Sequence, residues 1–247
     1  MKGFTIILRR ELAGLYFSPV SWFLLAATLL YNGFFFLTML QASGGEVNLA
    51  LSAMHQGPLW FLLSFLAPLL TMRMISEEGR SGMLEFLLTA PVTDAAVVLG
   101  KLVASTVFLV VAWTSVPLYA LLCQFLGAPP DWGQVATQWL GVAFVATLFS
   151  GIGLVASAAS ATPLFAAFLA ILANLLLLVL PLATGFVRGP WREGAEWVRD
   201  KIDVQAHFQG SFLTGAIDSA HLVFYAAWIG LVVFLAVRLL ESKRWAR

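Results

Sequence analysis

The sequence predicts an all-α integral membrane protein: a six-transmembrane-helix bundle, preceded by an interfacial helix and carrying one short amphipathic helix in a charged loop. Composition is the first reason. Hydrophobic residues make up 60% of the 247 residues and charged residues only 11%, with a mean hydropathy of +0.90, whereas soluble domains carry about 25% charged residues. Clustering of the charges is the second reason, because it leaves apolar runs longer than the roughly 20 residues that span a bilayer.

Two helices are expected at the N-terminal end. Residues 2–16 place apolar residues at helical spacing among basic ones, which is typical of a helix lying in the membrane interface; a simple cytoplasmic tail is the alternative. Residues 20–40 form the first span, since no charge occurs between Glu11 and Glu46. This apolar run is longer than the core of a signal peptide, and no small-residue cleavage site follows it, so we expect a permanent helix.

The second and third spans flank the charged loop. Residues 41–57 predict a polar loop. The second span covers residues 58–75 and is expected to break at Pro68, because proline removes a helical hydrogen bond. The third span covers residues 97–126 as one helix with Pro117 inside it. A Gly-Ala-Pro-Pro-Asp turn then leads into the second half of the chain.

The second half predicts three further spans. No charged residue occurs between Trp132 and Val187, and this run is too long for one helix. A stretch of small residues divides it into spans at 135–158 and 163–186. The last span covers residues 220–239, so that six spans form a single transmembrane domain over the whole chain, residues 1–247.

Small and polar residues mark two more features of this half. Gly151 and Gly153 lie at the end of the fourth span, where small residues let helices approach closely, within or between subunits; a substrate path is the alternative. Residues 188–219 are polar, but residues 207–218 within them are apolar enough to touch the membrane and predict an interfacial or re-entrant element. Asp218 is expected to cap the last helix, because aspartate favours helix N-termini.

The segment 72–101 holds the only close charge cluster in the first 180 residues apart from the N-terminal end. Its charged residues are Arg73, Glu77, Glu78, Arg80, Glu85, Asp94 and Lys101. Since such charges avoid hydrocarbon, the segment must lie in water or among headgroups. Residues 83–88 predict a short amphipathic helix that Pro91 ends. A short helix in a tight loop between two spans is a site where a soluble partner could dock.

The distribution of basic residues predicts the orientation. Six spans place both termini on one side, and the basic residues of both chain ends and of the segment 72–101 all fall on that side, which is therefore cytoplasmic. The loop at 188–219 is the one conflict, since it carries four basic residues on the opposite side. Acidic residues balance them, so we expect this loop outside the cell membrane.

Motifs for catalysis, nucleotide binding and metal binding are absent or incomplete. Leu99-Gly100-Lys101-Leu102 lacks the earlier glycine and the Ser or Thr of a phosphate-binding loop. The three histidines have no metal-ligand spacing, the single cysteine excludes an internal disulfide, and the net charge of +1 gives no hint of nucleic-acid binding. A Ser/His/Asp set can be assembled from His207 or His221, Asp218, and Ser211 or Ser219, and an intramembrane hydrolase is therefore kept as a remote alternative.

Three stretches resemble a known family, the permease subunits of type-2 ABC exporters, and are closest to its gliding-motility branch. They are the central M-R-M-I-S-E-E-G-R-S-G-M-L-E-F-L-L-T-A-P-V with V-L-G-K, the A-H-F-Q-G-S-F-L-T-G-A-I-D before the last span, and the N-terminal R-R-E-L-A-G-L-Y-F-S-P-V. The resemblance implies six spans, an N-terminal interfacial helix, a dimer of permeases, and a separate ATPase that docks on the loop from Glu77 to Leu88. It identifies no substrate.

The expected function is therefore a membrane-spanning permease, without catalytic residues or cofactors, that moves its substrate by alternating access while a separate subunit binds and hydrolyses ATP. The expected ATPase-coupling residues are Glu77, Glu78, Arg80, Gly82, Met83, Glu85, Phe86 and Leu87, with the short helix as a cytoplasmic coupling helix. Expected partners are an ABC ATPase dimer, a second copy or related permease, and a possible periplasmic protein, all at a bacterial inner membrane. The main alternative is a mechanotransmission or assembly subunit that acts on a periplasmic partner through residues 188–219.

Overall fold

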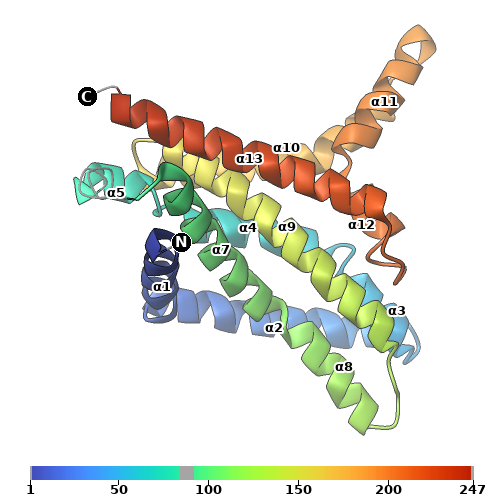
Figure 1. Cartoon of the computed structure of the whole chain (residues 1–247). Coiled ribbons are helices and arrows are strands. Elements are labelled where there is room, and N and C mark those ends of the chain that lie inside the picture. Colours follow the sequence, from blue (N-terminus) through green and yellow to red (C-terminus); the bar gives the residue numbers. More distant parts are fainter. Residues whose placement is uncertain (1, 84–91, 246–247) are drawn as a thin grey trace.

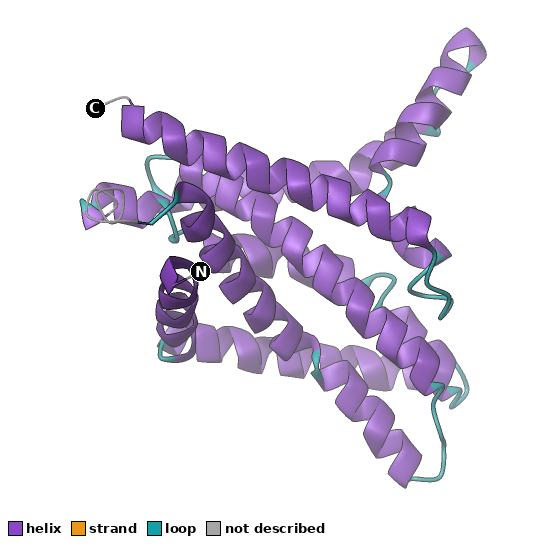
Figure 2. Cartoon of the chain, viewed as in Figure 1, coloured by secondary structure: helices purple, strands orange, loops and turns teal. Residues whose placement is uncertain are grey.

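The computed structural model describes residues 2–83 and 92–245, and these consist of helices joined by turns, without strands (Figures 1 and 2). Six helical segments are long and apolar enough to cross a membrane, which confirms the predicted all-α fold. In chain order the elements are α1 (Lys2–Tyr16), α2 (Pro19–Ala42), α3 (Val47–Met54), α4 (Pro58–Thr71), α5 (Ser76–Arg80), α7 (Asp94–Trp113), α8 (Ser115–Phe125), α9 (Trp132–Ala159), α10 (Pro163–Thr184), the 3₁₀ turn η1 (Gly189–Trp191), α11 (Arg192–Ile202), α12 (Val204–Gly210) and α13 (Ser219–Trp245).

The prediction of a polar loop over residues 41–57 is wrong, because its central part forms α3 and enters the core. Leu51 and Met54 are almost fully buried there. His55 follows α3 and is also buried: its Nδ1 bonds the Leu51 carbonyl at 2.9 Å, and its Nε2 accepts from Trp113 Nε1 at 3.2 Å. The two buried polar side chains of this segment, Ser52 and His55, thus find partners inside the bundle, which lets its apolar residues pack.

Two prolines act differently from expectation. Helix α4 continues through Pro68 to Thr71, so a single missing N–H inside a buried helix does not break it. The third span is instead divided at Thr114, between α7 and α8. Pro117 lies four residues after Trp113, the last residue of α7, and its ring clashes with the carbonyl four residues back.

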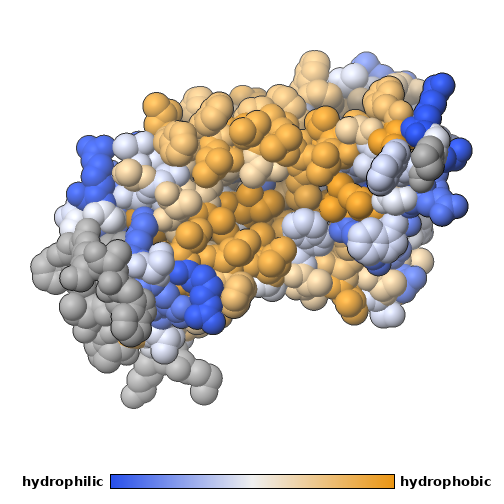
Figure 3. Space-filling view, turned by 90° about the horizontal axis from the view of Figure 1, so that it is seen from above, coloured by the Kyte–Doolittle hydropathy of each residue, from blue (hydrophilic) through white to orange (hydrophobic). Residues whose placement is uncertain are grey.

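Helix α9 forms the centre of the bundle and packs against α4, α7, α10 and α13. In its most apolar window, 67% of the residues are buried, against 17% in α2 and α13 and 22% in α10. Figure 3 shows apolar side chains across the middle of one face and polar ones at its two ends. This distribution is that of a bundle whose outer helices face lipid or a second protein.

Residues 188–219 form η1, α11 and α12 rather than a loop. Helix α11 has no buried residue and projects away from the bundle (Figure 1). Phe208 and Phe212, which we expected at the membrane interface, are fully buried, because Gly141 of α9 leaves room for both rings. Asp218 precedes α13, and its Oδ1 accepts from Ala220 N at 2.9 Å, which confirms the predicted cap.

Candidate functional site

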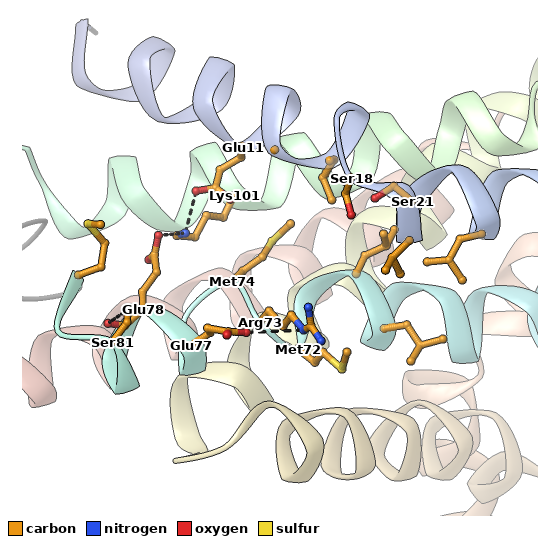
Figure 4. Close-up of a pocket in the computed structure, with 17 residues that line it drawn as sticks. Glu11, Ser18, Ser21, Met72, Arg73, Met74, Glu77, Glu78, Ser81 and Lys101 are labelled. Carbon is orange, nitrogen blue, oxygen red and sulfur yellow. Dashed lines mark hydrogen bonds and ion pairs between the residues drawn. The ribbon is translucent and has the colours of Figure 1, made fainter.

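Four charged side chains from three helices form a closed ion network at the end of the bundle that holds the N terminus. Lys101 of α7 is fully buried, and its Nζ lies 2.9 Å from Glu11 Oε1 of α1 and 2.9 Å from Glu78 Oε1 of α5 (Figure 4). Arg10 Nη2 lies 2.6 Å from Glu11 Oε1 and also pairs with Glu78. Two cations and two carboxylates make this ion network neutral, so it holds a buried ammonium without net charge.

Close packing of α1 on α7 places Glu11 over Lys101. Ile7 of α1 is buried, and a Cβ at Gly100 of α7 would lie only 2.8 Å from Ile7 Cγ2. A side chain at position 100 would therefore push the two helices apart. Ile7 and Glu11 are one turn apart on the same face of α1, and Lys101 follows Gly100, so the same close approach brings the charges together.

Helix α5 is fixed to the bundle on a second side. The backbone N–H groups of Ile75 and Ser76 donate to Ser157 Oγ of α9 at 3.2 and 3.1 Å, and this hydroxyl donates to Met72 O at 2.9 Å. With Glu78 in the ion network, α5 is held by α1, α7 and α9 together. A displacement of α5 would therefore disturb contacts with all three helices.

Opposite charges decide the ionisation of Glu11. Burial alone would raise the pKa of Glu11, but the Lys101 ammonium and the hydrogen bond from Arg10 outweigh it and hold the pKa below its ordinary value of 4.5. Removing either carboxylate would leave the buried Lys101 ammonium with only one anionic partner. Such a change destabilises the folded state, because the remaining charge stays buried without full compensation.

The described coupling residues divide into one inward-facing and several exposed positions. Glu78 points into the ion network, whereas Glu77 makes only an exposed pair with Arg73 at 3.6 Å. Arg80 and Met83 are exposed, and Gly82 adopts φ +76°, a backbone conformation that favours glycine. The remaining three predicted residues, Glu85, Phe86 and Leu87, lie outside the described residues.

The partners of Glu78 are not visible in the sequence. The expectation that Lys101 lies in water or among headgroups is wrong, because its side chain is fully buried in protein. The pattern of residues 2–16 indicates only an amphipathic helix for Arg10 and Glu11. The one hint is that Glu11 is the single acidic residue of this helix, and this does not identify Lys101 as its partner.

Gly151 and Gly153 both lie where α9 meets another helix of the same chain. A Cβ at Gly151 would lie 2.5 Å from Val232 Cγ2 of α13, and one at Gly153 would lie 2.0 Å from Thr71 Oγ1 of α4. Even a methyl group would displace the neighbouring helix at either position.

The polar residues of the remote hydrolase alternative are engaged in other contacts. Ser211 Oγ donates to Ala216 O at 2.8 Å and accepts from Asp218 N at 3.1 Å, which stabilises the turn before α13. His207 and His221 face each other, with 2.7 Å between their Nδ1 atoms. Among the described residues, no cluster of three or more His, Cys, Asp or Glu side chains could hold a metal ion.

Comparison with known proteins places the chain in a family. The sequence profile of the family described as "ABC-2 family transporter protein" matches residues 9–197, well over half of the chain. No curated protein matches the sequence of this chain. The matched region contains the ion network and the first five apolar spans, and a family of this kind works with an ABC ATPase. The chain therefore belongs to the ABC-2 family of transporter proteins and is the membrane-spanning permease subunit of an ABC transporter.

Proposed function

We propose that this permease exports its substrate by alternating access, driven by a separate ATPase dimer that docks at the α5 end and moves the bundle through the ion network. The observation that carries the proposal is the buried Lys101, which ties α1, α5 and α7 together through Glu11 and Glu78. A buried ion network contributes little net stability once the cost of desolvating its charges is counted, so we infer that this one serves to couple the three helices.

The docking surface is assigned to the segment from Glu77 to Leu88. Glu77, Arg80 and Met83 are exposed, as a contact surface requires. The sequence of residues 83–88 favours a short amphipathic helix whose apolar side enters a groove on the ATPase, as short helices commonly do. The permease itself contributes no catalytic residue, and ATP is bound by the partner.

The α5 end is assigned to the cytoplasm. Ile7 near the N terminus, Ile75 before α5 and Leu240 near the C terminus belong to one buried cluster, so both chain ends lie on the side of α5. The basic residues at these places favour the cytoplasmic side of a bacterial inner membrane. A cysteine at position 196 in a Cys123→Ser background tests this orientation, because only a reagent added from outside should label it; labelling from the cytoplasmic side alone would reverse the assignment.

A second permease completes the transporter in this proposal. Helices α2 and α10 bury little of their apolar surface within the chain, which suits a contact with a second copy or a related permease. Lipid covers the remaining outer surface.

The test of docking is co-purification of the ATPase with tagged permease in detergent. Phe86→Asp or Leu87→Asp should release the ATPase, because a charge in an apolar groove is costly, whereas Glu85→Gln should weaken retention only partly, as a rim charge does. Trp197→Asp is the matched control, since it places the same charge on an exposed residue of α11 at the opposite end. Wild-type retention in both Asp variants would move the docking surface elsewhere, with α1 as the next candidate.

The exposed helix α11 favours a second candidate function, in which the permease pulls on a periplasmic partner. Trp191 and Trp197 are 78% and 65% exposed on this projecting element, and aromatic residues are enriched at protein interfaces. ATP-dependent substrate flux into or out of vesicles containing only the permease and its ATPase separates the two functions, because the assembly subunit predicts no flux.

A further inference from the structure

A cavity of about 340 Å³ opens beside the ion network, between the start of α2 and the end of α4 (Figure 4). Glu11, Glu78 and Lys101 form one wall, but together with Arg10 they make up the neutral ion network. What the cavity can bind is therefore decided by its other walls, which divide into an apolar part and a polar part.

The apolar part extends toward the outer surface of the bundle. It is lined by Val20 and Leu24 from α2 and by Leu69 and Leu70 from α4. Val20 and Leu69 are 59% and 39% exposed, so this side of the cavity opens toward the zone where α2 leaves the membrane. An alkyl chain could lie along these side chains.

The polar part contains the N-terminus of α2. Helix α2 begins at Pro19, so the N–H groups of Val20 and Ser21 have no partner within the helix, and the helix dipole makes this end favourable for an anion. Ser21 is only 4% exposed and lines the cavity together with Ser18. Within the described part of the chain, neither hydroxyl makes a hydrogen bond. A hydroxyl without a protein partner, on a residue almost fully enclosed at a helix N-terminus, is free to donate to a ligand in the cavity.

Arg73 supplies a positive charge on the opposite wall. Its side chain is 66% exposed, and its one ion pair among the described residues, to Glu77, is long at 3.6 Å. Most of the five N–H donors of the guanidinium are thus available to a ligand, and guanidinium groups suit phosphate oxygens. Glu77 is 56% exposed beside it and would meet a cationic group.

We propose that this cavity binds a zwitterionic phospholipid from the leaflet on the side of the N terminus. The phosphate lies between the start of α2 and Arg73, the ammonium group of the headgroup lies near Glu77, and an acyl chain follows Leu24 and Leu69. A free phosphate ion would leave the apolar part empty, and a lipid without phosphate would leave Ser21 and Arg73 without an acceptor. The site does not depend on the ATPase or on the transported substrate.

Native mass spectrometry of delipidated wild-type permease, titrated with dioleoylphosphatidylethanolamine or with dioleoylglycerol, tests the proposal. The phospholipid should bind at least tenfold more tightly, since dioleoylglycerol lacks the charge-assisted hydrogen bonds. Arg73→Gln should lower the affinity for the phospholipid about tenfold and leave the affinity for dioleoylglycerol unchanged. Arg80→Gln is the matched control, because this exposed arginine lies in the same segment but outside the cavity.

Leu24→Trp fills the apolar part without changing any charge, and it should lower phospholipid binding as well. Equal affinity for the two lipids, or equal effects of Arg73→Gln and Arg80→Gln, would overturn the proposal. The proposal would also be overturned if inorganic phosphate, but not the phospholipid, raised the thermal unfolding midpoint of the permease. That result would identify a site for free anions.

Discussion

Glu11→Gln should destabilise the permease more than Lys101→Met, although both changes remove the same ion pair. In Glu11→Gln the ammonium of Lys101 stays buried, with its side chain 1% exposed, and keeps only Glu78 as an anionic partner. In Lys101→Met the buried charge disappears, and both carboxylates still pair with Arg10.

The magnitudes follow from this asymmetry. Leaving a fully buried charge without its partner costs about 3–5 kcal/mol. Because Lys101 keeps one of its two carboxylates, we expect roughly half, about 2 kcal/mol, for Glu11→Gln. At about 2–4 °C per kcal/mol for a chain of this length, the unfolding midpoint should fall by about 4–8 °C. Lys101→Met should cost about 1 kcal/mol, and the double variant should lose less than the sum of the two.

The assay is the thermal unfolding midpoint of the purified permease in detergent. Glu196→Gln is the matched control: it breaks a shorter pair, 2.7 Å from Arg192, but both side chains are more than half exposed, so the change should be within about 0.5 kcal/mol. A larger loss in Lys101→Met than in Glu11→Gln, or a Glu11→Gln midpoint equal to that of Glu196→Gln, would contradict a stabilising role of Glu11 beside the buried ammonium.

Three further predictions concern pH, packing and capping. The pKa of Glu11 is lowered in the folded state, so its stabilising contribution is complete above 4.5 and is lost as the pH falls below that value; the unfolding midpoint of Glu11→Gln should therefore fall less on acidification than that of wild type, and parallel curves would contradict this. Gly153→Ala should cost about 1–3 kcal/mol through the clash with Thr71, whereas Gly230→Ala, with open space at its Cβ, should cost nothing; equal midpoints would contradict the helix contact. Asp218→Ala should cost about 1 kcal/mol by removing the cap of α13, and a midpoint equal to that of the exposed-residue variant Asp200→Ala would argue against the cap.

The fold class and the position of the charged segment could be predicted from the sequence alone. Apolar runs are a local property, and a run of about 20 residues spans a bilayer whatever its neighbours are. Caps are equally local: Asp218 is next to the first turn that it caps, so its role could be predicted from the sequence.

Which charges are buried, and which apolar residues face the core, depends on how distant segments pack in three dimensions. Lys101 and Glu11 are separated by 90 positions, and nothing in the local pattern of either reveals that Gly100 lets α1 approach α7. The sequence likewise suggested that Phe208 and Phe212 lie at the membrane interface. In the structure both rings are buried, because Gly141 has no side chain to occupy the space that they fill. Hydropathy is a local property that can be summed along the chain. Burial and ion pairing instead depend on contacts between distant segments, and helix packing determines those contacts.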